Sequence, residues 1–311
     1  MAWLEITVKC DNVGVEDAVS ALTAGGFSDL VIEDQTQFED FLEENRACWD
    51  YIDEQLQQQL QGLCQIKLYL EDTDQQSLVR LQALAESKGL SLTVQPMAET
   101  NWEESWKDNY PAVEVGENLV VLPYWLENED HGGRLPIILD PGLTFGTGAH
   151  PSTQMVLQAM ENLIKPSFTC LDLGSGSGIL SIAALRLGAK SAIGVDIDPK
   201  AEDIARENAG YNGFAAPEFT ALTGNVTTDK PLMDRLSQGQ YDVVLVNIVA
   251  DVIIGLSPVL PRFLTESSTL ICSGMLDVRL PDVLDAITKA GLTVTAVYEK
   301  EDWRCITAKR S

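Results

Sequence analysis

The alternation of hydrophobic and polar residues along the chain predicts two parts of different architecture. Near the start, Ala2–Val8 alternates like a half-buried strand, and Val15–Ala24 has helical spacing that ends at Gly25. The same reading predicts a second helix at Asp74–Ser87 and further strands at Asp29–Glu33, Cys48–Ile52, Gln65–Leu70 and Leu90–Val94. This order predicts a small α+β, ferredoxin-like domain over residues 1–99.

Beyond residue 100 the pattern changes to strands that alternate with helices. Residues 100–115 are predicted to form a linker that includes a short helix at Asn101–Tyr110, and Val113–Leu122 a strand or hairpin around Gly116. Strands are then expected at Ile137–Asp140, Thr169–Leu173, Ser191–Asp196, Asp242–Val246, Ser268–Cys272 and Thr293–Tyr298, and helices at Ser152–Leu163, Ile179–Leu187, Pro199–Tyr211, Val252–Leu264 and Leu280–Ala290. Such alternation predicts an α/β fold with a doubly wound, mostly parallel sheet over residues 116–311.

The charge of the chain narrows the choice of partners. The 311 residues carry a formal net charge of −26, with −14 in residues 1–100 and −12 in the longer remainder. Such an acidic surface repels phosphate backbones, so we expect no direct nucleic-acid binding, and it attracts a basic partner instead. Because no apolar run has the length of a signal peptide core or of a membrane span, we expect no membrane contact. We also expect a cytoplasmic monomer.

The six cysteines do not indicate a metal site or a disulfide scaffold. None lies in a CxxC pair, and only His131 and His150 could complete a zinc site. We therefore expect reduced thiols and no bound metal.

The sharpest chemical signal is CLDLGSGSGIL at Cys170–Leu180, where a short apolar strand leads through three glycines into a helix. Glycine permits a tight turn close to a ligand, and the helix start supplies free N–H groups. Dehydrogenases use a similar turn, but their fingerprint needs glycine or alanine where this chain has Ile179. Asp172 would repel a pyrophosphate, whereas it could face an ammonium group such as that of S-adenosylmethionine.

Two further polar residues end predicted strands. Asp196 follows Gly174 by 22 residues, a spacing that suits an acid that binds ribose hydroxyls. The alternative, an N-cap of the next helix, suits Asp198 before Pro199 better. Asn247 ends the strand in YDVVLVNIVA, at the edge where doubly wound folds bind ligands. It either orients a substrate amine, lines the cofactor pocket, or forms a turn without a ligand.

The segment DPGLTFGTGAHPST, Asp140–Thr153, combines three glycines, an aromatic residue and several hydroxyls directly before a predicted helix. Ser152 or Thr153 could cap that helix. The loop either wraps a cofactor or is an ordinary surface loop. We interpret His150, the one histidine in this segment, as the source of a structural hydrogen bond rather than as a base.

In this order, DPGLTFGTGAHPST, LDLGSGSGIL, GVDIDP and VNIVA resemble the ribosomal protein L11 methyltransferases, and the likeness extends to NWEESWKDNY and the C-terminal EDWRCITAKR. The FGTG-x-HP loop is more specific than the glycine turn, which class I methyltransferases share. The resemblance implies an N-terminal substrate-recognition domain and a C-terminal class I methyltransferase domain. It also implies transfer of methyl groups from S-adenosylmethionine to lysine side chains and the α-amine of ribosomal protein L11.

Carried over by position, the resemblance implies cofactor contacts at Thr153, Gly174, Asp196 and Asn247, with Gly176, Phe145, Thr147 and Gly148 as further cofactor-binding neighbours. Because an amide is no base, we expect Asn247 to orient the amine or the cofactor, and we assign no proton acceptor. This chain departs from the family pattern at Ser152, at Val249 and in a longer stretch over Gly224–Gln240.

Three other functions remain open at this point. The same chemistry could act on a different basic protein, because the catalytic strings do not distinguish protein substrates. A nicotinamide-dependent oxidoreductase is disfavoured by Ile179 and by the FGTG loop. A non-catalytic binding module is disfavoured because the glycine turn, Asp196 and Asn247 are all intact.

Overall fold

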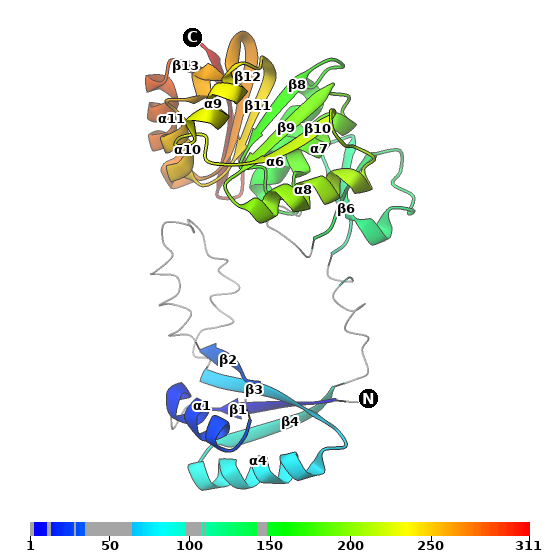
Figure 1. Cartoon of the computed structure of the whole chain (residues 1–311), viewed down its shortest axis with the longest axis vertical. Helices are drawn as coiled ribbons and strands as arrows, with labels where there is room; N and C mark the ends of the chain where they lie inside the picture. The colour runs from blue at the N-terminus through cyan, green and yellow to red at the C-terminus, as the bar shows by residue number, and fades with distance from the viewer. Residues whose placement is uncertain are drawn as a thin grey trace. The chain divides into compact units, whose positions relative to one another are not determined.

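A computed structural model describes residues 3–10, 14–27, 29–34, 64–97, 107, 110–141 and 148–311 of the chain. It contains two compact units, Met1–Asp108 and Asn109–Ser311, each with its own hydrophobic core (Figure 1). The strand expected at Cys48–Ile52 lies outside the described residues, as does the helix expected at Asn101–Tyr110 apart from its residues 107 and 110.

In its described residues, the first unit is a four-stranded antiparallel sheet with two helices. Its elements are β1 (Trp3–Lys9), α1 (Val15–Ala24), β2 (Val31–Asp34), β3 (Cys64–Glu71), α4 (Gln75–Lys88) and β4 (Ser91–Met97), and the strand order is β2-β3-β1-β4. α1 and α4 lie side by side (Figure 1). Alternate strand residues such as Ile6 and Ile66 are fully buried in one cluster with Leu22 and Leu81 of the helices. The assignment of this unit to the ferredoxin-like folds stays a prediction.

The second unit contains the predicted doubly wound sheet. Its strands are β8 (Thr169–Leu173), β9 (Ser191–Asp196), β10 (Phe219–Thr223), β11 (Tyr241–Asn247), β12 (Leu264–Leu276), β13 (Leu292–Lys300) and β14 (Trp303–Arg310). Their order is β10-β9-β8-β11-β12-β14-β13, parallel from β10 to β12, with β14 antiparallel to β12 and β13. The strand order changes direction at β8, and doubly wound folds bind their ligands at such a point.

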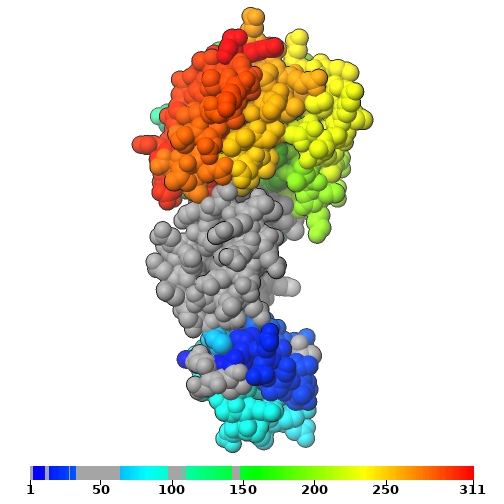
Figure 2. All heavy atoms as spheres, turned by 90° about the vertical axis from the view of Figure 1, so that its left-hand side faces the viewer, coloured from blue at the N-terminus to red at the C-terminus, as the bar shows by residue number. Residues whose placement is uncertain are grey.

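Helices cover both faces of this sheet. α6 (Pro151–Leu163), α7 (Ile179–Arg186) and α8 (Pro199–Tyr211) share one core cluster with the sheet, and α9 (Lys230–Ser237), α10 (Ala250–Leu256) and α11 (Leu280–Lys289) share the other. Alternate residues of one strand serve the two clusters: Leu245 lies in the first, and Val244 and Val246 in the second. Because both faces are covered, the central strands are continuous apolar runs rather than alternating ones. Figure 2 shows the segments coloured yellow to red packed into one continuous surface.

Several sequence predictions for this unit are wrong in detail. The helix expected at Val252–Leu264 is the shorter α10, because Pro258 lacks the N–H that a continuing helix needs, and it is followed by a 3-10 turn at Leu260–Arg262. The strands β10 and β14 and the helix α9 were not predicted. Two more 3-10 turns span Tyr124–Leu126 and Asp277–Arg279. Among the described residues, no helix combines the length and apolarity needed to cross a membrane.

A separate three-stranded sheet opens the second unit. It consists of β5 (Val113–Val115), β6 (Leu119–Pro123) and β7 (Leu135–Leu139) in the order β5-β6-β7. The hairpin around Gly116 is confirmed, and β5 lies within the range expected to be a linker. The expectation that the strand near Ile137 belongs to the doubly wound sheet is wrong, because β7 pairs with β6 instead.

Candidate active site

The glycine turn after β8 is held by backbone hydrogen bonds to the neighbouring strand. The N–H groups of Gly174 and Ser175 donate to Val195 O, over 2.8 and 3.1 Å. Gly174 and Gly178 have φ values of +77° and +79°, in the left-handed region that glycine adopts without strain. A Cβ at Gly178 would lie 3.0 Å from Ala205 Cβ, so glycine also allows α8 to pack closely here.

Asp196, at the end of β9, supports this turn directly. Its Oδ2 accepts from the N–H of Gly176 over 2.9 Å, and its Oδ1 accepts from the N–H of Asp198 over 3.0 Å. The N-cap of α8 is Asp198, which accepts from the N–H of Lys200 over 2.9 Å. The alternative reading of Asp196 as the helix cap is therefore wrong, and its carboxylate lies beside the glycine turn.

Asp172 lies in β8 and is fully buried. Its Oδ2 accepts from the N–H and the hydroxyl of Ser181, over 3.2 and 2.9 Å, at the start of α7. Its Oδ1 accepts no hydrogen bond from the described residues. Burial raises the pKa of Asp172 to about 7, although the two bonds from Ser181 act in the opposite direction. Only Oδ1 is left to accept a hydrogen bond from an ammonium group.

Asn247 ends β11 and meets the first turn of α6. Its Nδ2 donates to Oγ1 of the buried Thr153 over 3.1 Å. Its Oδ1 is buried and accepts no hydrogen bond from the described residues. Val246 is the register partner of Leu173 in β8, so Asn247 and Gly174 leave neighbouring strands at the same sheet edge. The structure thus brings Thr153, Gly174 and Asn247 together, from three distant parts of the sequence.

The start of α6 differs from expectation. His150 is the N-cap, and Pro151 is the first helical residue. The prediction that Ser152 or Thr153 caps this helix is wrong, because both lie inside its first turn with 2% and 1% exposed surface. Gly148 is buried with φ +85°, and a Cβ there would lie 2.8 Å from Val121 of β6. Phe145 and Thr147 lie outside the described residues.

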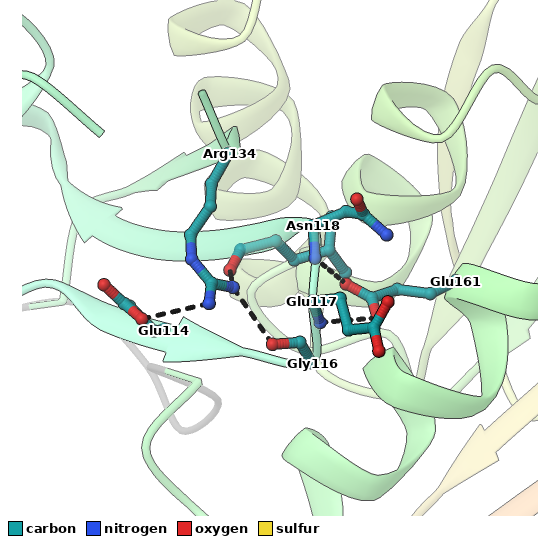
Figure 3. Close-up of polar contacts among 7 residues, drawn as sticks. Glu114, Gly116, Glu117, Asn118, Arg134 and Glu161 are labelled. Carbon is teal, nitrogen blue, oxygen red and sulfur yellow. Dashed lines mark hydrogen bonds and ion pairs between the residues drawn. The ribbon is translucent and has the colours of Figure 1, made fainter. Parts of the chain in front are cut away.

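The other end of α6 is fixed by polar contacts with the three-stranded sheet (Figure 3). The Glu161 carboxylate accepts from the N–H groups of Glu117 and Asn118 in the β5–β6 turn, over 3.0 and 2.8 Å. Arg134 donates to the carbonyl of Gly116 over 3.0 Å and forms an ion pair with Glu114, also over 3.0 Å. These contacts join the helix that carries Thr153 to the hairpin at the start of the unit.

One residue that supports the site was not singled out from the sequence. Gly274 lies within β12 with φ +89°, and a Cβ there would come within 2.5 Å of the carbonyl oxygen of Ile248. The pairing of β12 with β14 shifts register at this point. Only glycine lets β12 pass the chain directly after Asn247. A lone glycine inside a strand is the available signal, since it indicates a bulge or a close backbone approach.

The residues at this edge suit S-adenosylmethionine. That molecule carries an ammonium group and two ribose hydroxyls, all of which donate hydrogen bonds. Asp172 Oδ1 and Asn247 Oδ1 are buried acceptors that receive no hydrogen bond from the described residues. The Asp196 carboxylate ends the strand next to the glycine turn, at the position that binds ribose in such folds. The acceptors of the site therefore match the donors of S-adenosylmethionine.

Comparison with known proteins agrees with this chemistry. The model of the family described as "Ribosomal protein L11 methyltransferase (PrmA)" matches residues 2–311. Proteins named ribosomal protein L11 methyltransferase from Alkaliphilus metalliredigens and Alkaliphilus oremlandii are 34% and 33% identical to this chain. The alignments cover 99% of this chain in both cases, and 98% and 99% of the respective relatives.

A solved structure supports the same relationship. The ribosomal protein L11 methylase from Lactobacillus delbrueckii subsp. bulgaricus is 29% identical, with a TM-score of 0.58. The match covers 65% of this chain and 99% of the solved chain. The chain therefore belongs to the ribosomal protein L11 methyltransferase family, and it is a methyltransferase that uses S-adenosylmethionine.

Proposed function

We propose that this protein transfers methyl groups from S-adenosylmethionine to lysine side chains and to the α-amine of ribosomal protein L11. The observation that carries the proposal is the Asn247 amide, whose Nδ2 is engaged by Thr153 and whose buried Oδ1 accepts no hydrogen bond from the described residues. The names of the relatives supply the substrate, because both Alkaliphilus proteins are ribosomal protein L11 methyltransferases by name.

The cofactor is held by residues at the carboxyl edge of the sheet. Gly174 and Gly176 bring backbone close to the ligand, and Asp196 accepts from the ribose hydroxyls. Thr153 and Asn247, joined by a hydrogen bond, lie at the same sheet edge. We assign Phe145, Thr147 and Gly148 to the same pocket on the strength of the family motif alone.

The protein has to orient the reactants and exclude water, and it does not have to supply a strong base. S-adenosylmethionine supplies a methyl group that is already activated on a sulfonium. The accepting amine must be neutral, and a lysine with a pKa near ~10.4 is only about a thousandth neutral at pH 7.4. A desolvated pocket favours the neutral amine. Asn247 Oδ1 can accept a hydrogen bond from that amine or from the cofactor, and an amide does so without removing the proton itself.

The acidic first unit serves to bind the basic substrate. Residues 1–100 carry a net charge of −14, and opposite charge steers a basic protein toward this surface. The net charge of −26 disfavours contact with nucleic acid. We also propose a monomeric, cytoplasmic enzyme whose partner is a protein.

A methyl-transfer assay tests the proposal. The purified chain is mixed with labelled S-adenosylmethionine and with ribosomal proteins, free or assembled, and the label is located by mass spectrometry. We expect label on lysine or the α-amine of L11. Label on another basic protein would replace the substrate but keep the reaction, and a chain that binds no cofactor would overturn both. Asn247→Asp should lower the rate, and full activity with an unchanged pH profile would refute the orienting role of Asn247.

A further inference from the structure

His150 lies at a junction between α6 and the C-terminal hairpin. Its ring packs edge-on against the ring of Trp303 in β14, with centroids 4.4 Å apart and planes at 73°. Its main-chain oxygen accepts from the N–H of Gln154 over 3.1 Å, as the first bond of α6. The Thr153 that contacts Asn247 lies within this same first turn.

The hydrogen bonds of His150 define its protonation state. The N–H of Ser152 points at His150 Nδ1 over 3.3 Å, and the Ser152 hydroxyl lies 2.7 Å from the same atom. A backbone N–H can only donate, so Nδ1 must carry a lone pair. The neutral ring therefore holds its proton on Nε2. This arrangement makes His150 an N-cap and leaves Nδ1 engaged, so this nitrogen cannot take a proton from a substrate without losing the cap.

We propose that His150 is a positioning residue for methyl transfer, whose neutral ring holds the first turn of α6 and thereby places Thr153 against Asn247. The inference rests on the proposed function of that site. It assigns no proton transfer to His150, which acts only through the helix.

Contacts on both sides of His150 restrain the same turn. Gln154 donates from Nε2 to the carbonyl of Ala149 over 2.9 Å, and its Oε1 accepts from Lys300 at the end of β13. The buried Trp303 covers the His150 ring from β14. The hairpin β13–β14 and the loop before α6 therefore hold the turn together, through His150 and through Gln154.

Protonation of His150 would undo this arrangement. A proton on Nδ1 would leave the N–H of Ser152 without its acceptor and would turn the Ser152 hydroxyl from a donor into an acceptor. It would also place a positive charge at the positive end of α6. Burial lowers the pKa of His150, and the nearby Glu301 carboxylate opposes this effect. The first turn of α6 holds no acidic residue. Within the hairpin, Lys300 is bonded to Gln154, and Arg304 forms ion pairs with Asp277 and Glu299. The remaining charged residues of the hairpin are Asp302, Lys309 and Arg310.

Two amide variants separate positioning from a general need for histidine. Asparagine can place an oxygen near the Nδ1 position and is a good N-cap at every pH. Glutamine reaches toward the Nε2 position instead. We expect His150→Asn to stay within about threefold of the natural enzyme in kcat, and His150→Gln and His150→Ala to lose roughly tenfold to a hundredfold. His131→Asn is the matched control, because His131 takes no part in these contacts and bonds to Glu127 O instead.

Two readouts do not depend on the protein substrate. The chain has only two histidines, so imidazole ¹⁵N spectra with His131→Asn as the assignment variant report the tautomer of His150. The ratio of cofactor affinities, natural enzyme over His150→Asn, is measured from about pH 8 down to about pH 5. Titrations shared by both proteins, including that of Asp172, cancel in the ratio. We expect the Nε2-H tautomer and a ratio that falls at acidic pH.

The outcomes are decisive for His150 whichever protein proves to be the substrate. A proton on Nδ1 in the neutral ring, a flat affinity ratio, or a His150→Gln variant as active as His150→Asn would each overturn the proposal. If His150→Ala and His150→Gln fail to fold, the spectra and the ratio still decide. A natural enzyme that binds cofactor but leaves L11 unlabelled refutes the substrate in the proposed function and leaves these two measurements unchanged.

Discussion

Asn247, at the end of β11, donates a hydrogen bond from Nδ2 to Oγ1 of Thr153, in the first turn of α6, over 3.1 Å. The two residues are 94 positions apart in the chain. The bond orients the amide so that its oxygen faces away from Thr153. Any ligand that donates to this oxygen meets a side chain whose direction is already set, which reduces the entropy lost on binding.

Thr153→Val tests this orientation. Valine has a similar shape but offers no oxygen, so Asn247 Nδ2 loses its partner. We expect kcat/KM to fall roughly tenfold to a hundredfold, with the fold retained. Thr153→Ser keeps the hydroxyl and should retain most of the activity. The measurements are steady-state kinetics and cofactor affinity by calorimetry. Equal rates for the natural enzyme and the valine variant would show that the hydrogen bond does not matter for catalysis.

Asp196→Ala should weaken cofactor binding. The change removes the proposed acceptor for ribose and the bond from Gly176 that holds the glycine turn. Because a hydrogen bond to a charged group contributes about 1.5–3 kcal/mol, the dissociation constant should rise roughly tenfold to a hundredfold. Asp198→Asn is the control, since asparagine caps helices as well as aspartate does. Calorimetry would contradict the assignment if both variants bound the cofactor equally.

Asp172→Asn should change how the free energy of unfolding depends on pH. The pKa of Asp172 is raised from 3.8 to about 7 by burial. Between these values the folded protein keeps a proton that the unfolded chain releases, so stability falls as pH rises through this window. Asparagine has no such proton. The free energy of unfolding of the variant, relative to that of the natural protein, should therefore rise by on the order of 2–4 kcal/mol from about pH 4 to about pH 7. If the unfolding free energies of the two proteins, measured by urea titration, differed by the same amount at every pH in this range, the raised pKa of Asp172 would be excluded.

Gly116→Ala should destabilise the second unit more than Gly132→Ala does. Both glycines have left-handed backbone, with φ values of +58° and +61°, so each variant pays the same penalty of roughly 1–2 kcal/mol. At Gly116 the new Cβ would also come within 2.1 Å of Glu161 Oε2, whereas nothing lies within 4 Å at Gly132. The extra cost should be about 1–3 kcal/mol. In a Glu161→Ala background the two glycine variants should cost the same, and a persisting difference would assign the strain elsewhere.

Removal of the first unit should separate cofactor binding from protein methylation. Residues 109–311 contain both core clusters of the doubly wound sheet and every described residue of the candidate site. The truncated chain should bind S-adenosylmethionine with nearly the affinity of the full chain and should not methylate L11. Calorimetry and the methyl-transfer assay check the two halves of this expectation. Methylation at the full rate would show that the first unit has no role in substrate binding.

The alternating strands and helices of the second unit were predictable because its central strands are continuous apolar runs. Thr169–Leu173, Ser191–Asp196 and Pro199–Tyr211 have the bounds that the pattern predicts. The hydrophobic pattern could not assign β7 to its sheet, because the hydrophobicity of a strand does not determine which strand it pairs with. It also missed β14, whose identity as a strand depends on pairing with β12 and β13. Pro151 at the first helical position was a usable signal for His150 as the cap.

The candidate site divides in the same way. Motif spacing was sufficient for Gly174, Asp196 and Asn247, because strand ends and glycine turns are local features. Thr153 entered only through the resemblance to a family, since nothing local distinguishes it from Ser152. The sequence also could not show that Asp172 Oδ1 accepts no hydrogen bond from the described residues, because this depends on where Ser181 places its two donors.

The sequence by itself determined the fold class of the catalytic unit, its cofactor turn and its family, because these depend on local periodicity and on short motifs. Only the tertiary structure decided that Thr153 meets Asn247, that Gly274 passes Ile248, and that His150 joins α6 to the hairpin. These contacts join residues far apart in the chain. Their geometry is set by packing of the sheet against α6, which no local pattern encodes.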